Sequence, residues 1–390
     1  MPFTATALCP ARQTAERLTL AYVPVKVLLD YRPALRARTG VGEYIHRTAL
    51  ALADTAPAGS RVAVFSSSWK DRLQAPAPGV EGRDSRWPVA ALNWAWHRLE
   101  WPPVEWLAGA ADVVHSPTPL LLPSGAATQV VTIHDLFFLD HPEATAAEIR
   151  RDYPARVASH ARRADLVVTV SHTVAAQVAA RLDVDPAKIV TCHNGAPDWA
   201  PRAVAPPDGP AICVGTLEPR KNISRLLDAW ERLLANGLRV PLLLAGGAPA
   251  SAAPLLARLQ RPPLAGVARY VGYVEEADRR AFYEAARLLV LPSLDEGFGI
   301  PAVEAMTLGV PVAVSRRGAL PEVCGEAAAY LDPDDPQAMA DVIGTLLGDP
   351  ATLGALALRG PGQARRFSWT ASARRLWDAY RDASARRGRR

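Results

Sequence analysis

The sequence predicts an α/β protein of two parallel-sheet domains that face each other across a cleft. Short apolar runs alternate with longer amphipathic stretches along the chain, and this alternation is typical of parallel α/β folds. The pattern pauses once, in the proline-rich segment 196–210. In addition, 390 residues are more than a single core usually holds, so two domains are expected.

The first block of this pattern gives a first domain, predicted to span residues 25–200. Apolar runs rich in β-branched residues predict buried strands at 25–30, 61–67, 112–116, 129–135 and 165–171. Amphipathic stretches such as 42–54 and 172–183 predict helices between these strands. Residues 1–24 show no such pattern and are predicted to form a loose extension.

The second block follows a linker predicted at 201–210, where prolines break regular structure. The second domain, 211–368, has predicted strands at 211–216, 240–247, 268–273, 288–293, 310–315 and 327–332. Its helical patterns include 223–237 and 275–287. The last segment, 369–390, is predicted to be a helix with a basic tail that crosses back to the first domain. Ligands of such sheets bind beyond the carboxyl ends of the strands, so the cleft is the expected site.

Composition and charge exclude several classes of protein. Hydrophobic content of 49% with 21% charged residues is typical of a globular protein, and no apolar run reaches the ~18 residues of a membrane span. The four cysteines are far apart, which argues against a disulfide framework and favours the cytoplasm. The charge of +5 favours anionic partners, but no nucleic-acid-binding motif is present. Peripheral contact with the inner face of the plasma membrane stays an open alternative.

The densest group of functional residue types is "SLDEGFGIPAVEAMTLGVPV", residues 293–312. A predicted strand ends here, a glycine-rich loop follows, and a helix begins near Pro301. Glu296 and Glu304 stand eight residues apart, with Gly297 and Gly299 between them. The glycines let backbone amides approach a ligand, and the helix N-terminus suits a phosphate group. Carboxylates beside it can accept hydrogen bonds from sugar hydroxyls.

This motif resembles the signature of retaining GT-B glycosyltransferases of the family 4 type. Three further segments carry the resemblance, which covers roughly residues 25–382: 214–227 "VGTLEPRKNISRLL", 272–293 "GYVEEADRRAFYEAARLLVLPS" and 367–380 "FSWTASARRLWDAY". The resemblance implies two Rossmann-like domains, the first on the acceptor side and the second binding a nucleotide sugar.

The resemblance also implies residue roles in the second domain. Lys221 would contact the donor diphosphate, and Arg220 would add a second cation. Many relatives have Gly-Arg-Leu where this chain has Gly-Thr-Leu at 215–217, so Arg220 is our substitute for the missing arginine. Glu304 would hold the ribose hydroxyls. The alternative for Glu304 is a helix acid favoured by the dipole.

The remaining donor contacts would come from the same loop and from a neighbouring strand end. Glu296, with the amides of Phe298 and Gly299, would hold the donor sugar, and Gly297 and Ile300 complete this loop. Separately, Gly272 and Tyr273 would line the pocket of the base, mostly through their backbone.

The first domain contributes two further groups. Gly40 and Gly42 follow the first strand and open a helix, so their amides could approach the diphosphate. His134 and Asp135 end another strand, and relatives carry a histidine in this place, near the transferred sugar. His134 could hydrogen-bond the sugar or serve as a structural strand-end residue. Asp135 could act on the acceptor or cap the following turn, and His115 could line the acceptor side.

We expect no required metal and no other cofactor. No Asp-x-Asp follows a strand, and the other histidines show no metal spacing. Five tryptophans lie between 87 and 106; they could form a surface for a lipid-linked acceptor or a membrane, or belong to a helix that packs on the first sheet. The second interpretation is favoured, because Trp94 and Trp96 cannot both face one way on a helix.

The predicted function is hexosyl transfer, with retention, from a nucleoside diphosphate sugar to a hydroxyl of a glycan or lipid-linked acceptor. The wording of 30–44 and 215–222 resembles bacterial mannosyltransferases of polysaccharide assembly, so GDP-mannose is the first donor to consider. Two alternatives stay open. One is a catalytically silent GT-B module that binds nucleotide or scaffolds a complex. The other is a nucleotide-sugar 2-epimerase, for which the sequence offers no recognisable set of acid/base carboxylates.

Overall fold

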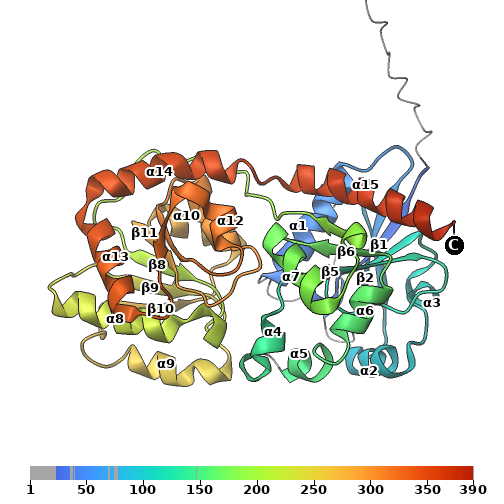
Figure 1. Cartoon of the computed structure of the whole chain (residues 1–390), viewed down its shortest axis with the longest axis horizontal. Helices are drawn as coiled ribbons and strands as arrows, with labels where there is room; N and C mark the ends of the chain where they lie inside the picture. Colours follow the sequence, from blue (N-terminus) through green and yellow to red (C-terminus); the bar gives the residue numbers. More distant parts are fainter. Residues whose placement is uncertain are drawn as a thin grey trace, which may run out of the picture.

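The computed structural model describes residues 23–35, 38, 40–68, 71–73, 78–145 and 147–389. Most of the predicted N-terminal extension, with Cys9, therefore lies outside the described residues. Figure 1 shows two α/β bodies side by side, with the C-terminal helix lying along the first of them. The prediction of two parallel-sheet domains is confirmed, since every strand pairing within the two sheets is parallel.

The first sheet has seven strands in the order β3-β2-β1-β4-β5-β6-β7. Their bounds are β1 Lys26–Asp30, β2 Arg61–Ser67, β3 Val80–Ser85, β4 Val113–Ser116, β5 Thr128–Ile133, β6 Leu166–Thr169 and β7 Ile189–Thr191. The helices are α1 Val41–Asp54, α2 Val89–Leu99, α3 Val104–Ala108, α4 Phe137–Asp140, α5 Ala147–Asp152, α6 Val157–Arg163 and α7 His172–Leu182.

The second sheet has six strands in the order β10-β9-β8-β11-β12-β13. Their bounds are β8 Ala211–Val214, β9 Leu242–Ala245, β10 Ala268–Gly272, β11 Leu288–Leu291, β12 Val312–Ser315 and β13 Ala328–Leu331. The helices are α8 Ile223–Ala235, α9 Ala253–Arg258, α10 Glu276–Glu284, α11 Ile300–Thr307, α12 Leu320–Cys324, α13 Pro336–Gly348, α14 Pro350–Ala364 and α15 Trp369–Arg387.

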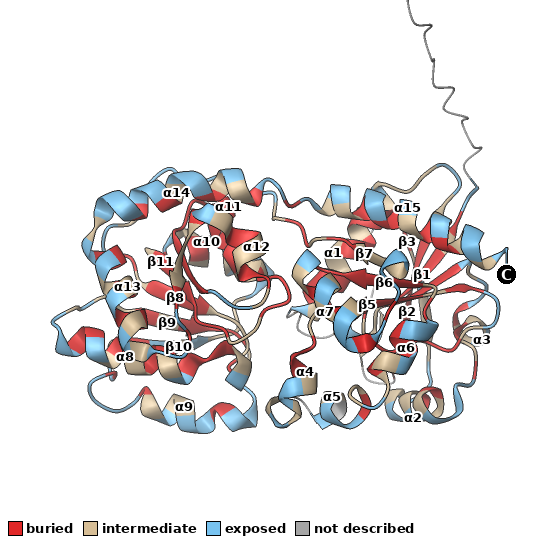
Figure 2. Ribbon diagram, viewed as in Figure 1, coloured by how far each residue is buried: buried red, intermediate tan, exposed pale blue. Residues whose placement is uncertain are grey.

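Burial explains why the central strands could be predicted from the sequence and two edge strands could not. The central strands are buried on both faces (Figure 2), as in β6 and β11, where every residue is buried, so they read as continuous apolar runs. The missed strand β3 is an edge strand of mixed polar sequence with one buried residue. The missed strand β7 is three residues long at the other edge.

The C-terminal helix α15 packs on the first domain although it follows the second in sequence. It contacts α1, β5 and β6. Trp377 is 2% exposed and donates a hydrogen bond from its indole nitrogen to the carbonyl oxygen of Leu52 at 3.1 Å. The two chain segments that connect the domains also touch, because the amide of Ala196 donates to the carbonyl oxygen of Phe367 at 3.0 Å.

The tryptophan-rich segment 87–106 only partly follows our interpretation. Helix α2 does pack on the first sheet, and Trp96 is buried with Leu28, Phe65 and Val114. The other four tryptophans of the segment are exposed. A helix of this length can bury only one face, and Trp94 lies on the opposite one.

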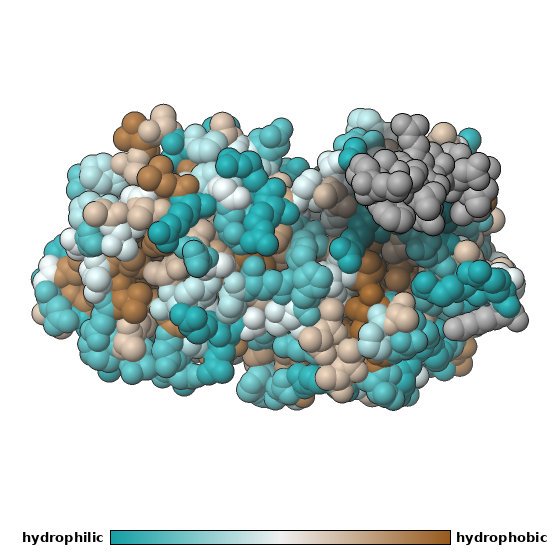
Figure 3. Space-filling view, turned by 45° about the horizontal axis from the view of Figure 1, so that its top comes forward, coloured by the Kyte–Doolittle hydropathy of each residue, from teal (hydrophilic) through white to brown (hydrophobic). Residues whose placement is uncertain are grey.

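Among the described residues, no single helix is long and apolar enough to cross a membrane. The segments Pro336–Gly348 and Pro350–Arg387, which meet at a bend of 92°, are together long and apolar enough, judged by length and composition alone. The face of the molecule seen in Figure 3 is mostly hydrophilic, with hydrophobic residues in small groups.

Candidate active site

A cavity of about 490 Å³ lies between the two domains, at the carboxyl ends of both sheets. This volume is in the range of small-molecule sites. Of the fourteen residues that the sequence predicted for the site, thirteen line the cavity. They are Gly40, Gly42, His134, Asp135, Arg220, Lys221, Tyr273, Glu296, Gly297, Phe298, Gly299, Ile300 and Glu304.

Gly272 is the predicted residue that does not line the cavity. It ends β10, and its carbonyl oxygen accepts a hydrogen bond from the amide of Gly246 at 2.8 Å. The backbone therefore faces β9, and the next residue, Tyr273, reaches the cavity. The hydroxyl of Tyr273 donates to the carbonyl oxygen of Arg38 at 2.8 Å, which ties the two domains together.

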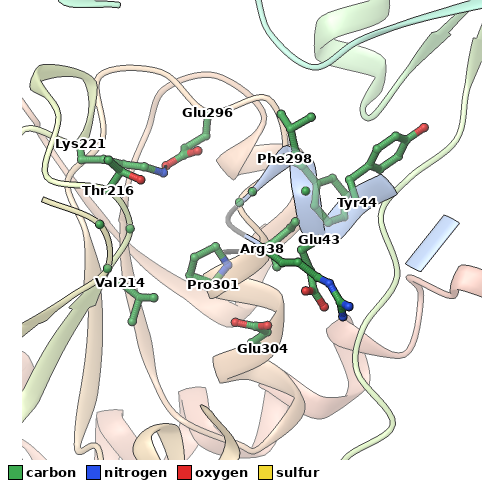
Figure 4. A pocket seen from close by; sticks show the side chains of 18 of the residues that line it. Arg38, Glu43, Tyr44, Val214, Thr216, Lys221, Glu296, Phe298, Pro301 and Glu304 are labelled. Atoms are coloured by element: carbon green, nitrogen blue, oxygen red, sulfur yellow. Dashed lines mark hydrogen bonds and ion pairs between the residues drawn. The ribbon is translucent and has the colours of Figure 1, made fainter. Parts of the chain in front are cut away.

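Glu296 lies at the centre of a buried ion-pair cluster. The ammonium of Lys221 is 2.5 Å from one carboxylate oxygen, the Ser293 hydroxyl is 2.7 Å from the same oxygen, and Arg220 reaches the other oxygen at 3.2 Å. Figure 4 shows the Lys221 side chain pointing at the Glu296 carboxylate. Burial would raise the pKa of Glu296, but the charges of Lys221 and Arg220 outweigh it and lower this pKa to about 2. The carboxylate is thus held as an anion.

Arg220 is less available for a ligand than we expected. Its guanidinium donates to the Glu218 carboxylate at 2.9 and 3.2 Å, to the carbonyl oxygen of Asp295 at 3.2 Å and to Glu296. Asp135 is 3.9 Å away. Burial opposes the charged form, yet these acids raise the pKa of Arg220. A guanidinium has five N–H groups, and most of them are already engaged.

Lys221, in contrast, keeps donors for a ligand. Within the described part of the chain, its ammonium has Glu296 as its hydrogen-bond partner, and an ammonium carries three N–H groups. Lys221 lies in the 3-10 turn Pro219–Lys221 that precedes α8, at the end of β8. Of the two cations, Lys221 thus has more N–H groups free to bind a ligand, while Arg220 contacts the other oxygen of Glu296.

The glycine loop before α11 has a role that we did not predict. A Cβ on Gly297 would lie 1.8 Å from the carbonyl oxygen of His134 in the other domain. Glycine at 297 is therefore needed for the contact between the two domains. Gly40, in contrast, has a φ of +40° and faces open space, because a Cβ added there would have no atom within 4 Å.

His134 presents a neutral imidazole to the cavity. Its Nε2 lies 3.0 Å from the carbonyl oxygen of Pro117, and a carbonyl can only accept, so Nε2 carries the hydrogen. Burial lowers the pKa of His134, and the Pro117 and Asp135 oxygens offset only part of this effect. Nδ1 is then a hydrogen-bond acceptor. The ring packs edge-on against Tyr44 of α1, with 4.7 Å between centroids.

Glu304 belongs to a second charged cluster, whose other members the sequence reasoning missed. Arg279 donates to one of its oxygens at 3.0 Å, and the hydroxyl of Tyr283 donates to the other at 2.8 Å. Burial raises the pKa of Glu304, and these two partners offset it in part. Glu43 of α1 lies 3.7 Å from Arg279, and both carboxylates face the same part of the cavity (Figure 4). Glu43 could have been found from the sequence, because it is an acidic residue that directly follows the Gly-x-Gly at the start of α1.

His115, which the sequence offered only as a residue that could line the acceptor side, does not line the cavity. It is fully buried, with Nδ1 2.6 Å from the Tyr380 hydroxyl of α15 and Nε2 2.7 Å from the Thr132 hydroxyl. Thr132 in turn lies 3.2 Å from the hydroxyl of Tyr44. Burial lowers the pKa of His115 to about 3, so it is a neutral part of a chain of hydrogen bonds that supports α1.

Glu322 of α12 caps helix α7 of the other domain. Its carboxylate accepts hydrogen bonds from the amides of His172 and Thr173 at 2.9 and 2.8 Å and from the Thr173 hydroxyl at 2.8 Å. His193 adds a fourth hydrogen bond, from Nε2 at 3.0 Å. Within the described ranges, His172, His193 and Glu322 are the one group of three potential metal ligands whose ligand atoms lie close enough to share an ion. All four lone-pair positions of the carboxylate are occupied by N–H and O–H donors, so the group acts as a helix cap.

Family models match both halves of the chain. Residues 38–198 match the model for Glycosyltransferase Family 4, and residues 210–349 match the model for Glycosyl transferases group 1. The O-antigen chain mannosyltransferase B of Escherichia coli is 33% identical over 282 residues, which cover 69% of this chain and 74% of that protein. The serotype-specific mannosyltransferase WbdA of Escherichia coli is 28% identical over 264 residues, and this chain spans only 32% of its length.

Two solved structures of similar fold match over nearly their whole length. Sucrose-phosphate synthase from Thermosynechococcus elongatus superposes with a TM-score of 0.76 at 23% identity, over 93% of this chain and 99% of that one. WaaG, a glycosyltransferase involved in lipopolysaccharide biosynthesis, superposes with a TM-score of 0.68 at 15% identity, over 91% of this chain and 99% of that one. At such identities the likeness concerns the fold, which is the GT-B arrangement that the resemblance implied.

The two sheets, the cavity between them and the sequence matches in both halves agree, and the chain belongs to the family 4 glycosyltransferases with the GT-B fold.

Proposed function

We propose that this glycosyltransferase moves mannose, with retention, from a nucleoside diphosphate sugar to a hydroxyl of a glycan or lipid-linked acceptor in polysaccharide assembly. GDP-mannose is the first donor to test. The choice of sugar is supported by the relative named as an O-antigen chain mannosyltransferase, which is 33% identical over most of its length.

The observation that carries the donor assignment is the placement of Lys221. Its ammonium lies in the cavity with N–H groups to spare, beside the glycine loop that leads into α11. A dianionic diphosphate would gain charge-assisted hydrogen bonds from it. Ribose hydroxyls can donate to Glu304, whose two oxygens each have one described partner and can accept another.

Retention fits a front-face route better than a covalent sugar intermediate. Glu296 is the carboxylate nearest the predicted sugar position, but three donors engage its two oxygens, which makes it a poor nucleophile. In the front-face route the bond from the anomeric carbon to the diphosphate oxygen breaks, and the acceptor oxygen bonds to the same face. The acceptor proton passes to the leaving diphosphate. Nδ1 of neutral His134 can accept a hydrogen bond from the sugar and stabilise positive charge that develops near it.

The residues also favour a reaction without a required metal ion. Lys221 and the amides at the start of α11 can neutralise the leaving diphosphate. The acids that line this part of the cavity are already paired with cations, Glu296 with Lys221 and Arg220, and Glu304 with Arg279. We expect turnover to survive EDTA; loss of turnover that magnesium or manganese restores would refute this.

The test is to incubate the protein with a panel of nucleoside diphosphate hexoses and to follow the products. Transfer or slow hydrolysis, with the anomeric configuration kept in the proton NMR spectrum, is expected for one donor. An epimerised nucleotide sugar would indicate the 2-epimerase. Tight nucleotide binding with no product from any donor would indicate a silent module. An inverted product would overturn the front-face route.

Substitution of the two glutamates Glu296 and Glu304 should change different kinetic parameters. Glu304, assigned to the ribose, contacts a part of the donor that does not react, so Glu304→Gln should raise KM more than it lowers kcat. Glu296→Gln should lower kcat far more than it weakens binding of a sugar-free nucleoside diphosphate. If both variants lose that nucleotide equally, these roles are wrong.

A further inference from the structure

Helix α2 and the segment after it carry a large share of the exposed apolar side chains. Among the described residues nine large hydrophobic side chains are exposed, and five of them lie between 87 and 106. These five are Trp87 at 47% exposure, Trp94 at 60%, Leu99 at 58%, Trp101 at 50% and Trp106 at 70%. Scattered exposed apolar residues are ordinary, but a group of aromatic ones along one short stretch is a candidate interaction surface.

The buried face of α2 holds the exposed face outward. Leu92 and Trp96, four residues apart, are buried against the sheet, and the indole nitrogen of Trp96 donates to the carbonyl oxygen of Pro102 at 2.8 Å. Residues 90, 91, 94 and 98 are exposed on the other side. Trp94 therefore cannot turn inward without removing Trp96 from the core.

The exposed indoles are also unused as donors. Trp87, Trp94, Trp101 and Trp106 donate no side-chain hydrogen bond to any residue in the described ranges, whereas Trp96 and Trp377 do. Trp101 and Trp106 pack edge to face with 5.7 Å between centroids. An apolar ring with a free N–H suits the interface of a bilayer, where the ring meets acyl chains and the N–H meets carbonyl groups and water.

The charge of this surface is positive. Arg86 and Arg98 are exposed and have no ion pair with any described residue. Of the two acids of the stretch, Glu100 forms two hydrogen bonds of 2.7 Å with Arg163. Glu105 accepts only from neutral groups, the Ser124 hydroxyl and the amide of Gly125, and keeps its negative charge. The stretch therefore carries two cations without an ionic partner, Arg86 and Arg98, against one such anion, Glu105, and its net charge is positive.

We propose that residues 86–106, called here the tryptophan edge, bind the surface of an anionic phospholipid bilayer. Anionic headgroups would neutralise Arg86 and Arg98 while the indoles enter the interfacial layer. A second copy of the chain fits less well, because a two-fold contact would bring the same arginines of both copies together. Helix α5, whose Asp152 lies 3.5 Å from His97, extends the edge with the exposed Arg150, and Figure 1 shows α2 and α5 along the same side of the first domain.

The experiment is co-sedimentation of the full chain with vesicles. Vesicles of phosphatidylcholine alone are compared with vesicles that contain one third phosphatidylglycerol, at low salt and without donor or acceptor. We expect binding to the anionic vesicles, with a blue shift of tryptophan fluorescence. Trp94→Ser with Trp106→Ser should weaken binding at least about tenfold. Arg86→Gln with Arg98→Gln should weaken it by roughly fivefold for each charge removed.

Matched controls lie in the second domain. Leu358→Ser removes an 85% exposed apolar side chain, and Arg232→Gln with Arg261→Gln removes two exposed charges; neither should change binding. Equal binding to both kinds of vesicle would overturn the proposal, as would unchanged binding of the double tryptophan variant. A concentration-dependent dimer that the tryptophan substitutions abolish would assign the edge to a second copy instead. Because no sugar nucleotide is present, these outcomes are independent of the transferase reaction.

Discussion

Lys221 is the residue at which the donor assignment can be tested most directly. Replacing it by Met removes one charge-assisted contact to the diphosphate, so binding of a nucleoside diphosphate should weaken by roughly 1.5 to 3 kcal/mol, which is tenfold or more. Calorimetric titration measures this. Lys188→Met is the control, because that ammonium binds the carbonyl oxygens of Arg162 and Ala164 on the first domain. An unchanged dissociation constant for Lys221→Met would remove it from the phosphate site.

Asp295 gives a pH prediction at the same scale. Burial, with the carboxylate of Asp135, raises its pKa from 3.8 to about 6. From about pH 4 to 6 the unfolded chain loses this proton while the folded chain keeps it, so stability falls as pH rises and stays lower above 6. Asp295→Asn should thus raise the free energy of unfolding by roughly 1 to 3 kcal/mol at pH 7.5.

The same substitution should change almost nothing at about pH 3, below the unfolded pKa of 3.8, where the folded and unfolded chains both hold the proton. Urea denaturation at the two pH values measures the difference. A gain of equal size at both values would show that Asp295 acts through packing and not through its charge.

Local sequence was enough to find the residues of one segment but not their partners. Glu296, Lys221 and the glycines were found because a strand, a loop and a helix start follow each other in the chain. Arg279 and Glu43 were missed, since the ion pairs of Arg279 with Glu304 and with Glu43 join residues far apart in sequence. The ion pair of Arg220 with Glu296, 76 residues away, was missed for the same reason.

At the scale of single elements, the start of α7 is held by a residue of the other domain. The Ser171 hydroxyl accepts a hydrogen bond from the amide of Val174 at 3.1 Å, while the Glu322 carboxylate accepts hydrogen bonds from the amides of His172 and Thr173. Glu322→Gln keeps the shape but removes the negative charge at the positive end of the helix. We expect a loss of roughly 1 to 3 kcal/mol in the free energy of unfolding.

The same change should loosen the contact between the domains. Small-angle scattering should report a larger radius of gyration for Glu322→Gln, and the linker should be cut faster by protease. Glu326→Gln, one turn away and exposed, is the matched control. If both variants behave like the wild type, the cap does not hold the domains together.

Element types were predictable where the pattern was strong and not where the element was short or polar. Each strand proposed from an apolar run is present within a few residues, whereas β3 and β7 were not proposed. A helix packed on the first sheet was the favoured interpretation of the tryptophan-rich segment, but the exposure of Trp94 and Trp106 depends on which face meets the sheet. That is decided by neighbours contributed from distant segments.

At the scale of the whole molecule, α15 makes the stability of the first domain depend on the end of the chain. Trp377→Ala would empty a buried site between α15 and α1 and should cost about 3 to 5 kcal/mol. Trp94→Ala, the same change at an exposed site of the same domain, should stay within about 0.5 kcal/mol of the wild type. Denaturant unfolding compares them, and similar losses for both variants would contradict the packing seen for α15.

The contact between the two connecting segments has a consequence for motion. The chain leaves the first domain once, near Gly195, and returns once, near Trp369, and a Cβ on Gly195 would lie 2.3 Å from the amide nitrogen of Trp369. With the amide of Ala196 hydrogen-bonded to the carbonyl oxygen of Phe367 beside it, the two crossings are held together at one place. We therefore expect any change in the angle between the domains to be a rotation about this place and not a separation of the domains. Any side chain at 195 would push the two crossing segments apart and change the angle between the two domains.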